Sequence, residues 1–210
     1  MSATAEPRKV RKQREDGLRS RRTILDAAAK LATVEGLEGL SIGRLAEHIG
    51  MSKSGLYAHF GSKEELQLAT IETASEIFDE HVVRPSEDFE SPLARLETLC
   101  EAFLRHLELR VFPGGCFFAS AAAEFDTHPG AVKEQITSYS LGWLTALEDL
   151  VTLAQEAGEL DPRDDPAQVA FEIDAHLLMA NTAFLLYNEP KTLDRARAAI
   201  RARLRGPAGR

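Results

Sequence analysis

SIGRLAEHIGMSKSGLYAHFGSKEEL, residues 41–66, contains two short apolar patterns separated by glycine and serine. Serine is a preferred helix N-cap and glycine a preferred C-cap, so Ser41 and Gly50 should bound one helix, and Ser52 and Gly61 a second. A helix of about eight residues is unstable alone in water, because its nucleation costs more than its few hydrogen bonds return. Both helices must therefore be held by packing against longer neighbours.

The apolar side chains of this stretch recur at helical spacing, and they can hold the two helices in place. They are Ile42, Leu45, Ala46, Ile49, Leu56 and Phe60. Gly50 permits the left-handed backbone of a tight turn between the helices. Ser62 and Glu65 fit a capping box, which predicts the start of a longer helix. We therefore predict a helix-turn-helix in which the opposite face of the second helix stands clear of the bundle.

That exposed face carries donors and small groups suited to DNA. Lys53 can reach guanine acceptors or a phosphate, and Tyr57 and His59 can donate to phosphate oxygens. Lys63 and the free N–H groups of the next helix make a second anion site. The predicted DNA-binding residues are Ser41, Ser52, Lys53, Ser54, Gly55, Tyr57, His59 and Lys63. Structural roles compete for some of them: the serines cap helices in any case, the Tyr57 ring can pack inward, and His59 can be a plain surface residue.

The formal net charge is −8, but the charge is distributed unevenly along the 210 residues. Residues 1–65 carry 12 Lys and Arg against 9 Asp and Glu, a net of +3, and the other 145 residues carry 13 against 24, a net of −11. The basic charge is densest near the N-terminus. A polar, basic run of this kind is expected to be a disordered tail over residues 1–18, with an arm that follows DNA phosphates as the functional alternative.

The rest of the chain is expected to be all-α, since no long run alternates with the period of a strand. We predict a helix-turn-helix domain over 19–66, a connecting helix over 67–84, and a larger helical domain over 85–205 before a short tail at 206–210. Two prolines, two serines and acidic residues just after the connecting helix indicate the boundary between the domains.

Residues 57–60 (YAHF) and 62–66 (SKEEL), in this helix-turn-helix context, resemble the DNA-binding signature of the TetR family of transcriptional regulators. The resemblance covers about residues 20–70. It implies an all-helical fold with an N-terminal helix-turn-helix, a larger ligand-binding and dimerisation domain, and usually repression relieved by a small molecule. The positions that match the family's usual DNA contacts are Lys53, Ser54, Gly55, Tyr57, His59 and Lys63. Ser41 stands where threonine is more frequent, and Met51 replaces the commoner valine.

The same resemblance implies a homodimer on double-stranded operator DNA. The last two long helices, over 166–187 and 192–205, would pair with their copies across a two-fold axis. The nearly continuous apolar character of residues 177–187 agrees with an interface as well as with a core.

The second domain has aromatic and apolar stripes with a few polar interruptions. A polar side chain that is buried needs a partner, and a ligand can be that partner. The candidate ligand-binding residues are Phe103, His106, Phe117, Trp143, His176 and Asn181. Most of the aromatic ones are equally expected in an ordinary core, and the histidines can be structural.

No catalytic set and no metal-ligand spacing is evident, so we predict neither an enzyme nor a cofactor or metal. Cys100 and Cys116 are too few for a disulfide framework or a zinc module. A regulator of the same fold that senses a metal or thiol oxidation remains the alternative, followed by an enzyme with an ancillary helix-turn-helix. No apolar run approaches the ~18 residues of a membrane helix and no signal peptide is evident, so we expect a cytoplasmic protein without a membrane partner.

Overall fold

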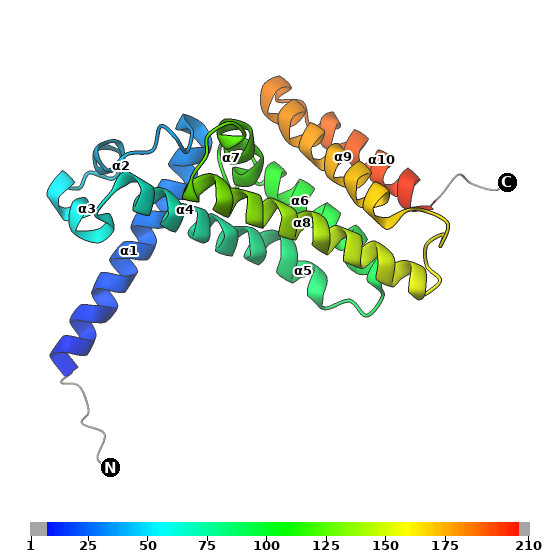
Figure 1. Cartoon of the computed structure of the whole chain (residues 1–210), viewed down its shortest axis with the longest axis horizontal. Helices are drawn as coiled ribbons and strands as arrows, with labels where there is room; N and C mark the ends of the chain where they lie inside the picture. The colour runs from blue at the N-terminus through cyan, green and yellow to red at the C-terminus, as the bar shows by residue number, and fades with distance from the viewer. Residues whose placement is uncertain (1–7, 206–210) are drawn as a thin grey trace, which may run out of the picture.

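The computed structural model describes the backbone of residues 8–205 and the side chains of residues 20–205. The described residues are mainly helical and contain no strand, which confirms the all-α prediction (Figure 1). In chain order the elements are α1 (Arg8–Glu35), α2 (Ile42–Ile49), α3 (Lys53–Phe60), α4 (Lys63–Phe78), the π-helix η1 (Asp79–Val83), α5 (Arg84–Glu87), α6 (Pro92–Glu108), α7 (Phe117–Phe125), α8 (Ala131–Glu156), α9 (Pro166–Tyr187) and α10 (Lys191–Arg205).

One core holds the helix-turn-helix. Leu45 and Leu56 are completely buried, and Phe60 is nearly so, against α1 and α4. The predicted holding residues are therefore inside, except Ile49, which is half-buried. This core does not end at the predicted domain boundary, because it also contains α7 and the first turns of α8. The apolar face of α7 packs on α1, although nearly ninety residues separate the contacting parts of the chain. The spacing of apolar residues within one helix could not show such a distant contact.

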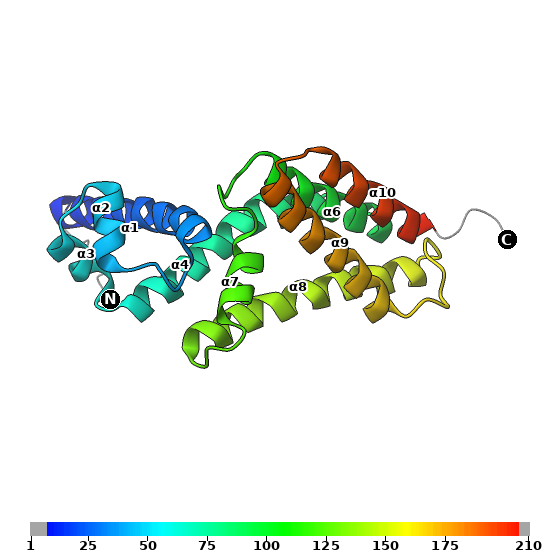
Figure 2. The same cartoon turned by 90° about the horizontal axis from the view of Figure 1, so that it is seen from above.

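A second core lies among α6, α8, α9 and α10. Leucine is its most frequent residue, and it also contains Phe103, Phe184 and the η1 residue Val82. Helix α4 belongs to both cores: Leu66 and Ile71 are buried in the first, and Phe78 in the second. Figures 1 and 2 show α4 leading from the end of the molecule with α1, α2 and α3 toward the end with α6, α9 and α10.

Helix α1 begins well before the predicted domain start. The backbone is helical from Arg8, so the expectation of a disordered tail over 1–18 is wrong for residues 8–18. The segment is rich in arginine, lysine, glutamine and glutamate, which are good helix formers, and it continues a helix that packing already anchors, so no new nucleation is needed. Residues 1–7 and the predicted tail at 206–210 lie outside the described residues.

The connecting helix also differs from the predicted range of 67–84. It begins at Lys63, passes at Asp79 into a π turn, and continues as α5 to Glu87. The Arg84 N–H donates to the Asp79 carbonyl, five residues earlier. Pro85 follows at once, and it has no N–H to continue α-helical bonding. The first residues of the predicted domain boundary, Pro85 to Glu87, therefore still belong to a helix, α5, which follows the wider π turn of η1.

The loop before α7 approaches α1 closely at Gly114. The Gly114 N–H donates to the Thr33 hydroxyl at 3.1 Å, and a Cβ added to Gly114 would lie 1.8 Å from the Thr33 carbonyl oxygen. A clash with backbone cannot be relieved by turning a side chain, so only glycine fits this contact. Gly142 in α8 is the opposite case, since a Cβ there would meet nothing within 4 Å.

We predict opposite effects of adding a methyl group at these two glycines. Gly114→Ala should lower the free energy of unfolding by about 1–3 kcal/mol, because the loop must move away from α1. Gly142→Ala should raise it by about 0.5–1 kcal/mol, because alanine has less backbone entropy to lose in a helix. Urea denaturation followed by circular dichroism measures both, and equal effects of the two substitutions would contradict the close contact at Gly114.

Candidate nucleic-acid interface and cavity

Three serine hydroxyls fix the starts of the helices around the turn. Ser41 Oγ accepts the Arg44 N–H at 3.2 Å, Ser52 Oγ accepts the Gly55 N–H at 3.2 Å, and Ser62 Oγ accepts the Glu65 N–H at 3.1 Å. Ser41 uses its oxygen as the acceptor, so its O–H hydrogen is still available as a donor, and capping is compatible with a phosphate contact there. Ser52 Oγ also lies 3.3 Å from Ser54 Oγ, and either hydroxyl can be the donor of that hydrogen bond. Gly50 closes α2 in the left-handed conformation with φ 67°.

One side of α3 is open to solvent. Ser52, Lys53 and Ser54 are exposed, and Gly55 is half-buried. Tyr57 is 56% exposed, so the alternative in which its ring packs inward is wrong. The reason is helical geometry: Leu56 and Phe60 take the inward positions one turn apart, and the residue after Leu56 is turned about 100° away from them. The phenol hydroxyl of Tyr57 is thus presented outward.

Lys53 extends along α2. A methyl group at Gly43, the second residue of α2, would lie 3.4 Å from Lys53 Cε and 3.5 Å from Nζ. The ammonium group therefore lies beside the first turn of α2, where free backbone N–H groups already favour an anion. Lys53 and the Ser41 end of α2 together form one positively polarised region next to the exposed side of α3.

His59 and Lys63 are less free than the sequence suggests. His59 is half-buried, and its carbonyl accepts a hydrogen bond of 2.9 Å from Arg21 Nη1. The Arg21 guanidinium also lies 4.6 Å from the centre of the Phe60 ring, which ties α1 to the end of α3. Lys63 Nζ lies 2.7 Å from Glu38 Oε1, and this ion pair lowers the pKa of Glu38. Both side chains of the pair are about half exposed, so it is worth only about 0–1 kcal/mol and a phosphate can displace it.

Arg44 is a basic residue near this face that the sequence did not single out. Its guanidinium donates to Glu35 at 2.7 and 2.5 Å and to Glu47 at 2.9 Å. The hydrogen bond from Arg44 is the main reason that the pKa of Glu35 is lowered. Two carboxylates thus neutralise Arg44, and Lys53 is the more available cation for DNA.

A cavity of about 450 Å³ lies between α4, η1, α6, α7, α8 and α9. Aromatic rings supply much of its wall: Phe78, Phe103, Phe118, Tyr139 and Trp143. The Phe78 ring meets Trp143 edge-on with 5.3 Å between ring centres, and Trp143 stacks on Phe103 at 6.0 Å. The remaining wall includes small residues of α7 and α8, so the space is suited to a flat apolar group.

Two carboxylates and several hydroxyls add polarity to this cavity. Asp174 Oδ1 accepts the Trp143 Nε1 N–H at 2.8 Å, and burial raises the pKa of Asp174 although this hydrogen bond opposes the shift. Burial also raises the pKa of Asp79, opposed by the charge of Arg84. The hydroxyl groups belong to Ser75, Ser138, Tyr139 and Ser140. None of the described residues that line the cavity is lysine, arginine or histidine.

The structure separates the six predicted ligand-binding residues. Phe103 and Trp143 line the cavity, whereas Phe117, His106, His176 and Asn181 do not. Phe117 is buried in the first core instead, beside Phe112. The prediction missed Phe78, Asp79, Tyr139 and Asp174, of which Asp174 alone had a visible signal, as one of two carboxylates in an otherwise apolar helix.

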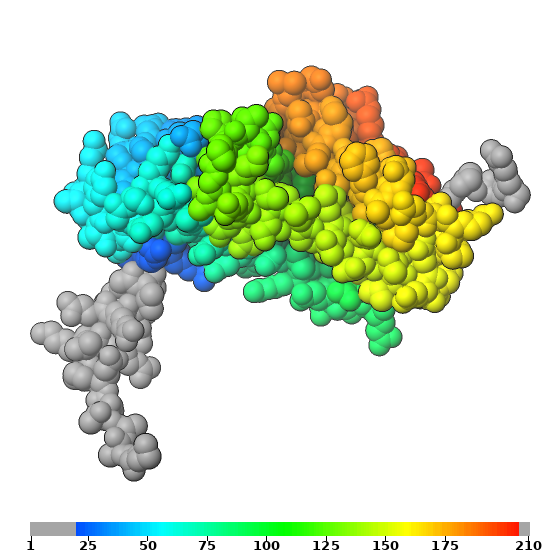
Figure 3. Space-filling view, viewed as in Figure 1, coloured from blue at the N-terminus to red at the C-terminus, as the bar shows by residue number. Residues whose placement is uncertain are grey.

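The polar residues among these six have other surroundings. Asn181 Oδ1 accepts the Cys116 N–H at 2.8 Å, so a protein group satisfies its need for a partner. Asn181 instead faces the groove between α7 and α9, which the space-filling view shows as a hollow (Figure 3). His106 is buried among aromatic rings, and burial, aided by the nearby His81, lowers its pKa to about 4. His176 is half-buried on α9 outside the cavity.

The structure gives little support to the alternative of a thiol or metal sensor. Cys100 and Cys116 are both buried, and burial raises the pKa of Cys100 to about 12 and that of Cys116 to about 11. Because the thiolate is the reactive form, burial disfavours the reaction of both thiols at neutral pH. Within residues 20–205, no group of three His, Cys, Asp or Glu side chains is placed to hold a metal ion.

Helix α9 presents an apolar face to solvent. Its exposed large apolar residues are Phe171, Leu178, Met179, Leu186 and Tyr187. The helix is long and apolar enough to cross a membrane by length and composition, but Ile173 and Leu177 are completely buried in the second core, as in a core helix of a globular protein. These exposed apolar residues extend from Phe171 to Tyr187 along α9.

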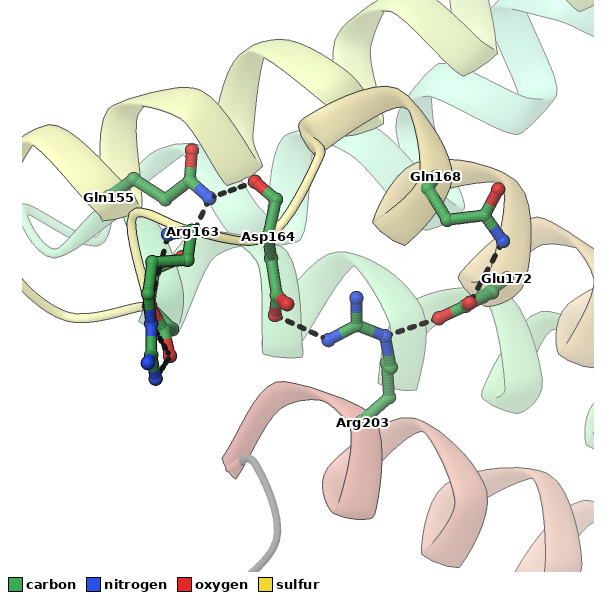
Figure 4. A network of polar contacts seen from close by, with 7 residues as sticks. Gln155, Arg163, Asp164, Gln168, Glu172 and Arg203 are labelled. Carbon is green, nitrogen blue, oxygen red and sulfur yellow. Dashed lines mark hydrogen bonds and ion pairs between the residues drawn. The ribbon is translucent and has the colours of Figure 1, made fainter.

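Helix α10 is fixed against the start of α9 by a polar network (Figure 4). Arg203 donates to Asp164 at 2.7 Å and also to Glu172, while Gln155 of α8 donates to the Asp164 carbonyl at 2.8 Å. Arg203 is largely shielded from solvent, so its ion pairs are less screened than surface ones. Helices α8, α9 and α10 are thus joined at one end of the second core.

Family profiles match both parts of the chain. One described as "Bacterial regulatory proteins, tetR family" matches residues 24–70, and one described as "Tetracyclin repressor-like, C-terminal domain" matches residues 92–200. A curated HTH-type transcriptional regulator of Staphylococcus aureus (strain USA300) is 33% identical over 78 residues. That stretch is 37% of this chain and 42% of the relative, so less than half of the relative's length is matched.

Solved structures resemble nearly the whole chain. A TetR transcriptional regulator from Chloroflexus aurantiacus J-10-FL has a TM-score of 0.82 and 25% identity, over 89% of this chain and 94% of that one. AibR, in complex with isovaleryl coenzyme A and operator DNA, has a TM-score of 0.69 and 24% identity, over 87% and 96% of the two chains. The likeness to AibR shows the fold alone. Since the C-terminal profile by itself spans more than half of the sequence, the chain belongs to the TetR family of DNA-binding transcriptional regulators.

Proposed function

We propose that the protein is a homodimeric repressor that a small molecule releases from a pseudo-palindromic operator. The observation that carries this proposal is the exposed side of α3, where Lys53, Ser54 and Tyr57 stand clear of a core that holds the helix rigidly. Two copies of α3, related by a two-fold axis, would enter successive major grooves of double-stranded DNA. Occupying the operator in this way blocks transcription, and such a protein acts in the cytoplasm, where its DNA is.

The contacts to DNA divide into two kinds. Lys53, Ser54 and Gly55 are near the start of α3, where side chains and backbone can approach base edges. Ser41, Ser52, Tyr57 and Lys63 surround that position and suit phosphate oxygens, which fix the orientation of the protein on the duplex. The half-buried ring of His59, at the other end of α3, is a further hydrogen-bond donor for a phosphate oxygen.

The dimer would form through α9 and α10. The apolar face of α9 is the main support, because an exposed apolar stripe of this length is unfavourable in water and a copy of itself across a two-fold axis can bury it. The exposed side of α10 is mainly charged, with Arg195, Arg201 and Arg205. Apolar α9 would therefore form the centre of the interface and α10 its polar rim.

The cavity would bind the effector. Its wall includes Phe78 and Asp79 at the end of α4, and the other end of α4 begins at Lys63, beside α3. A ligand that fits the cavity better in one position of α4 favours that position, and so changes the spacing of the two α3 helices in the dimer. AibR shows that this fold can hold an organic ligand and operator DNA. We propose no catalytic role and no cofactor.

The first prediction from this proposal concerns DNA affinity and its salt dependence. Tyr57→Phe should weaken binding roughly three- to tenfold, because phenylalanine has no hydroxyl to donate to a phosphate oxygen. Lys63→Ala should also weaken it and make the plot of log K against log salt shallower by about 1, because the protein neutralises one phosphate fewer. Glu38→Gln should strengthen binding, because it frees Lys63 from its ion pair.

Gel shifts at several salt concentrations measure these effects on duplexes selected from a random pool by the unaltered protein. Arg163→Ala is the matched control, since Arg163 is likewise an exposed cation in an ion pair, with Asp161, but lies in the loop between α8 and α9. Unchanged affinity in both Tyr57→Phe and Lys63→Ala would contradict the assigned contacts.

A second prediction concerns the dimer. Met179→Asp should weaken self-association at least about tenfold, because it buries an unpaired carboxylate in the apolar interface twice per dimer. Sedimentation velocity over a range of protein concentrations measures the dimer dissociation constant. Leu141→Asp is the control, because Leu141 is similarly exposed but lies on α8. A dimer equally stable in both variants would exclude α9 as the interface.

A third prediction separates this proposal from a thiol sensor. The native protein should react slowly with a thiol reagent near neutral pH, and the reaction of both cysteines should become fast after unfolding in guanidinium chloride. The physical reason is that burial raises the pKa of both thiols, which leaves very little thiolate in the native state. Fast reaction of Cys116 in the folded protein would instead favour the redox alternative.

A further inference from the structure

The walls of the cavity favour a positively charged group. Aromatic rings have a negative electrostatic potential at their faces, and a cation within about 6 Å of a ring centre is attracted to it. Trp143, Phe103 and Phe78 lie at one part of the wall, within 5.3–6.1 Å of one another by ring centres. Tyr139 and Phe118 add a second pair of rings, 5.3 Å apart. A ligand in the cavity is therefore in contact with several ring faces and edges.

The two carboxyl groups of the wall, Asp79 and Asp174, have no lysine, arginine or histidine beside them in its lining. Asp174 is half-buried and has a hydrogen bond from Trp143 as its partner, and Asp79 lines the cavity from an exposed position. Among residues 20–205, no ion pair joins either carboxylate to a basic side chain, although the charge of Arg84 acts on Asp79. A carboxylate that is partly removed from water is stabilised by a cation, and the wall supplies none.

We propose that the effector is an organic cation, an amine or quaternary ammonium compound that carries an aromatic or other apolar group. This inference rests on the proposed function, because it names the ligand of the same cavity. The apolar group would lie among the aromatic rings, and the cationic group would be paired with Asp174 and Asp79. The hydroxyls of Ser75, Ser138 and Ser140 can accept the remaining N–H groups of an amine.

The same wall disfavours anions. A ligand with phosphate groups, such as the isovaleryl coenzyme A found with AibR, would meet two carboxylates and no basic side chain here. Like charges in a site of low polarity repel strongly, so the cavity would reject such a ligand unless the phosphates stayed in solvent. The expected order of affinity for ligands of one shape is therefore cation, then neutral molecule, then anion.

The two acidic residues also connect the ligand to the parts that would move. Asp79 is the first residue of η1, directly after α4, and Asp174 lies on α9, the helix proposed to form the dimer. A cation attracted to both would bias the position of α4 relative to α9. This is the differential interaction that a ligand needs in order to shift a conformational equilibrium.

The chain contains one tryptophan, so its fluorescence reports on the cavity directly. The probes are phenylbutylammonium, phenylbutanol and phenylbutyrate, which have similar size and differ in charge. We expect the ammonium compound to change Trp143 fluorescence with an affinity roughly tenfold higher than that of the alcohol, and the anion to bind most weakly.

Asp174→Asn and Asp79→Asn remove the charges with little change in volume. Asparagine at position 174 retains an oxygen that can accept the Trp143 N–H, so the ring should keep its place. Each substitution should reduce the preference for the ammonium compound over the alcohol, the double variant should abolish it, and affinity for the alcohol should be unchanged. Asp149→Asn on the exposed side of α8 is the control and should keep the full preference.

The outcomes separate this inference from the function on which it rests. If the alcohol or the anion binds as tightly as the ammonium compound, or if the double variant keeps the preference, the inference is wrong and a neutral or anionic effector is favoured. If none of the probes binds to a protein that still binds its selected DNA, both the inference and the cavity as effector site are wrong. If the ammonium compound binds with the predicted preference but does not release the DNA, cation recognition stands and the proposed release mechanism fails.

Discussion

Burial of α4 in two separate cores is the constraint on which the rest of the structure depends. Leu66 and Ile71 fix its first half among α1, α2 and α3, and Phe78 fixes its end among α6 and α8. Neither half can shift without disturbing apolar contacts that are closely packed. Because α2 and α3 are too short to be stable alone, the position of the exposed side of α3 is set by this helix and by α1. In the proposed mechanism, α4 is therefore the element that connects the cavity to the exposed side of α3.

The features that depend on local chemistry could be predicted from the sequence. Ser41, Ser52 and Ser62 cap their helices, and Gly50 takes a left-handed conformation, because a cap or a tight turn involves residues only a few positions apart. The inward positions of Leu56 and Phe60 likewise follow from helical spacing. This local information was enough for the helix-turn-helix and for the all-α fold.

The features that depend on contacts across the chain could not be predicted. Lys63 pairs with Glu38, which is 25 residues away, and Trp143 pairs with Asp174, which is 31 away. The spacing of such residues in the sequence does not show whether their polar groups are paired with each other or exposed to solvent. For the same reason Asn181 was a candidate ligand contact until its bond to the Cys116 N–H was known. Residues 8–18 were mispredicted for another reason. Their composition suits a helix, but the helix extends through them because the segment that follows is anchored by packing.

Pro85 links a local constraint on the backbone to the residues that line the cavity. In an ordinary α-helix the N–H at position 85 would donate to the carbonyl of His81, and proline has no N–H to give. The backbone adopts a π turn just before it, with Arg84 bonded to Asp79 instead, and a π turn takes more residues per turn than an α-helix. The residues at the ends of that turn, Asp79 and Val83, line the cavity together with Phe78 before it. The proline that suggested a domain boundary in the sequence thus directly follows the part of the connecting helix that lines the cavity, and Asp79, at the start of the π turn, gives that part of the wall an acidic side chain.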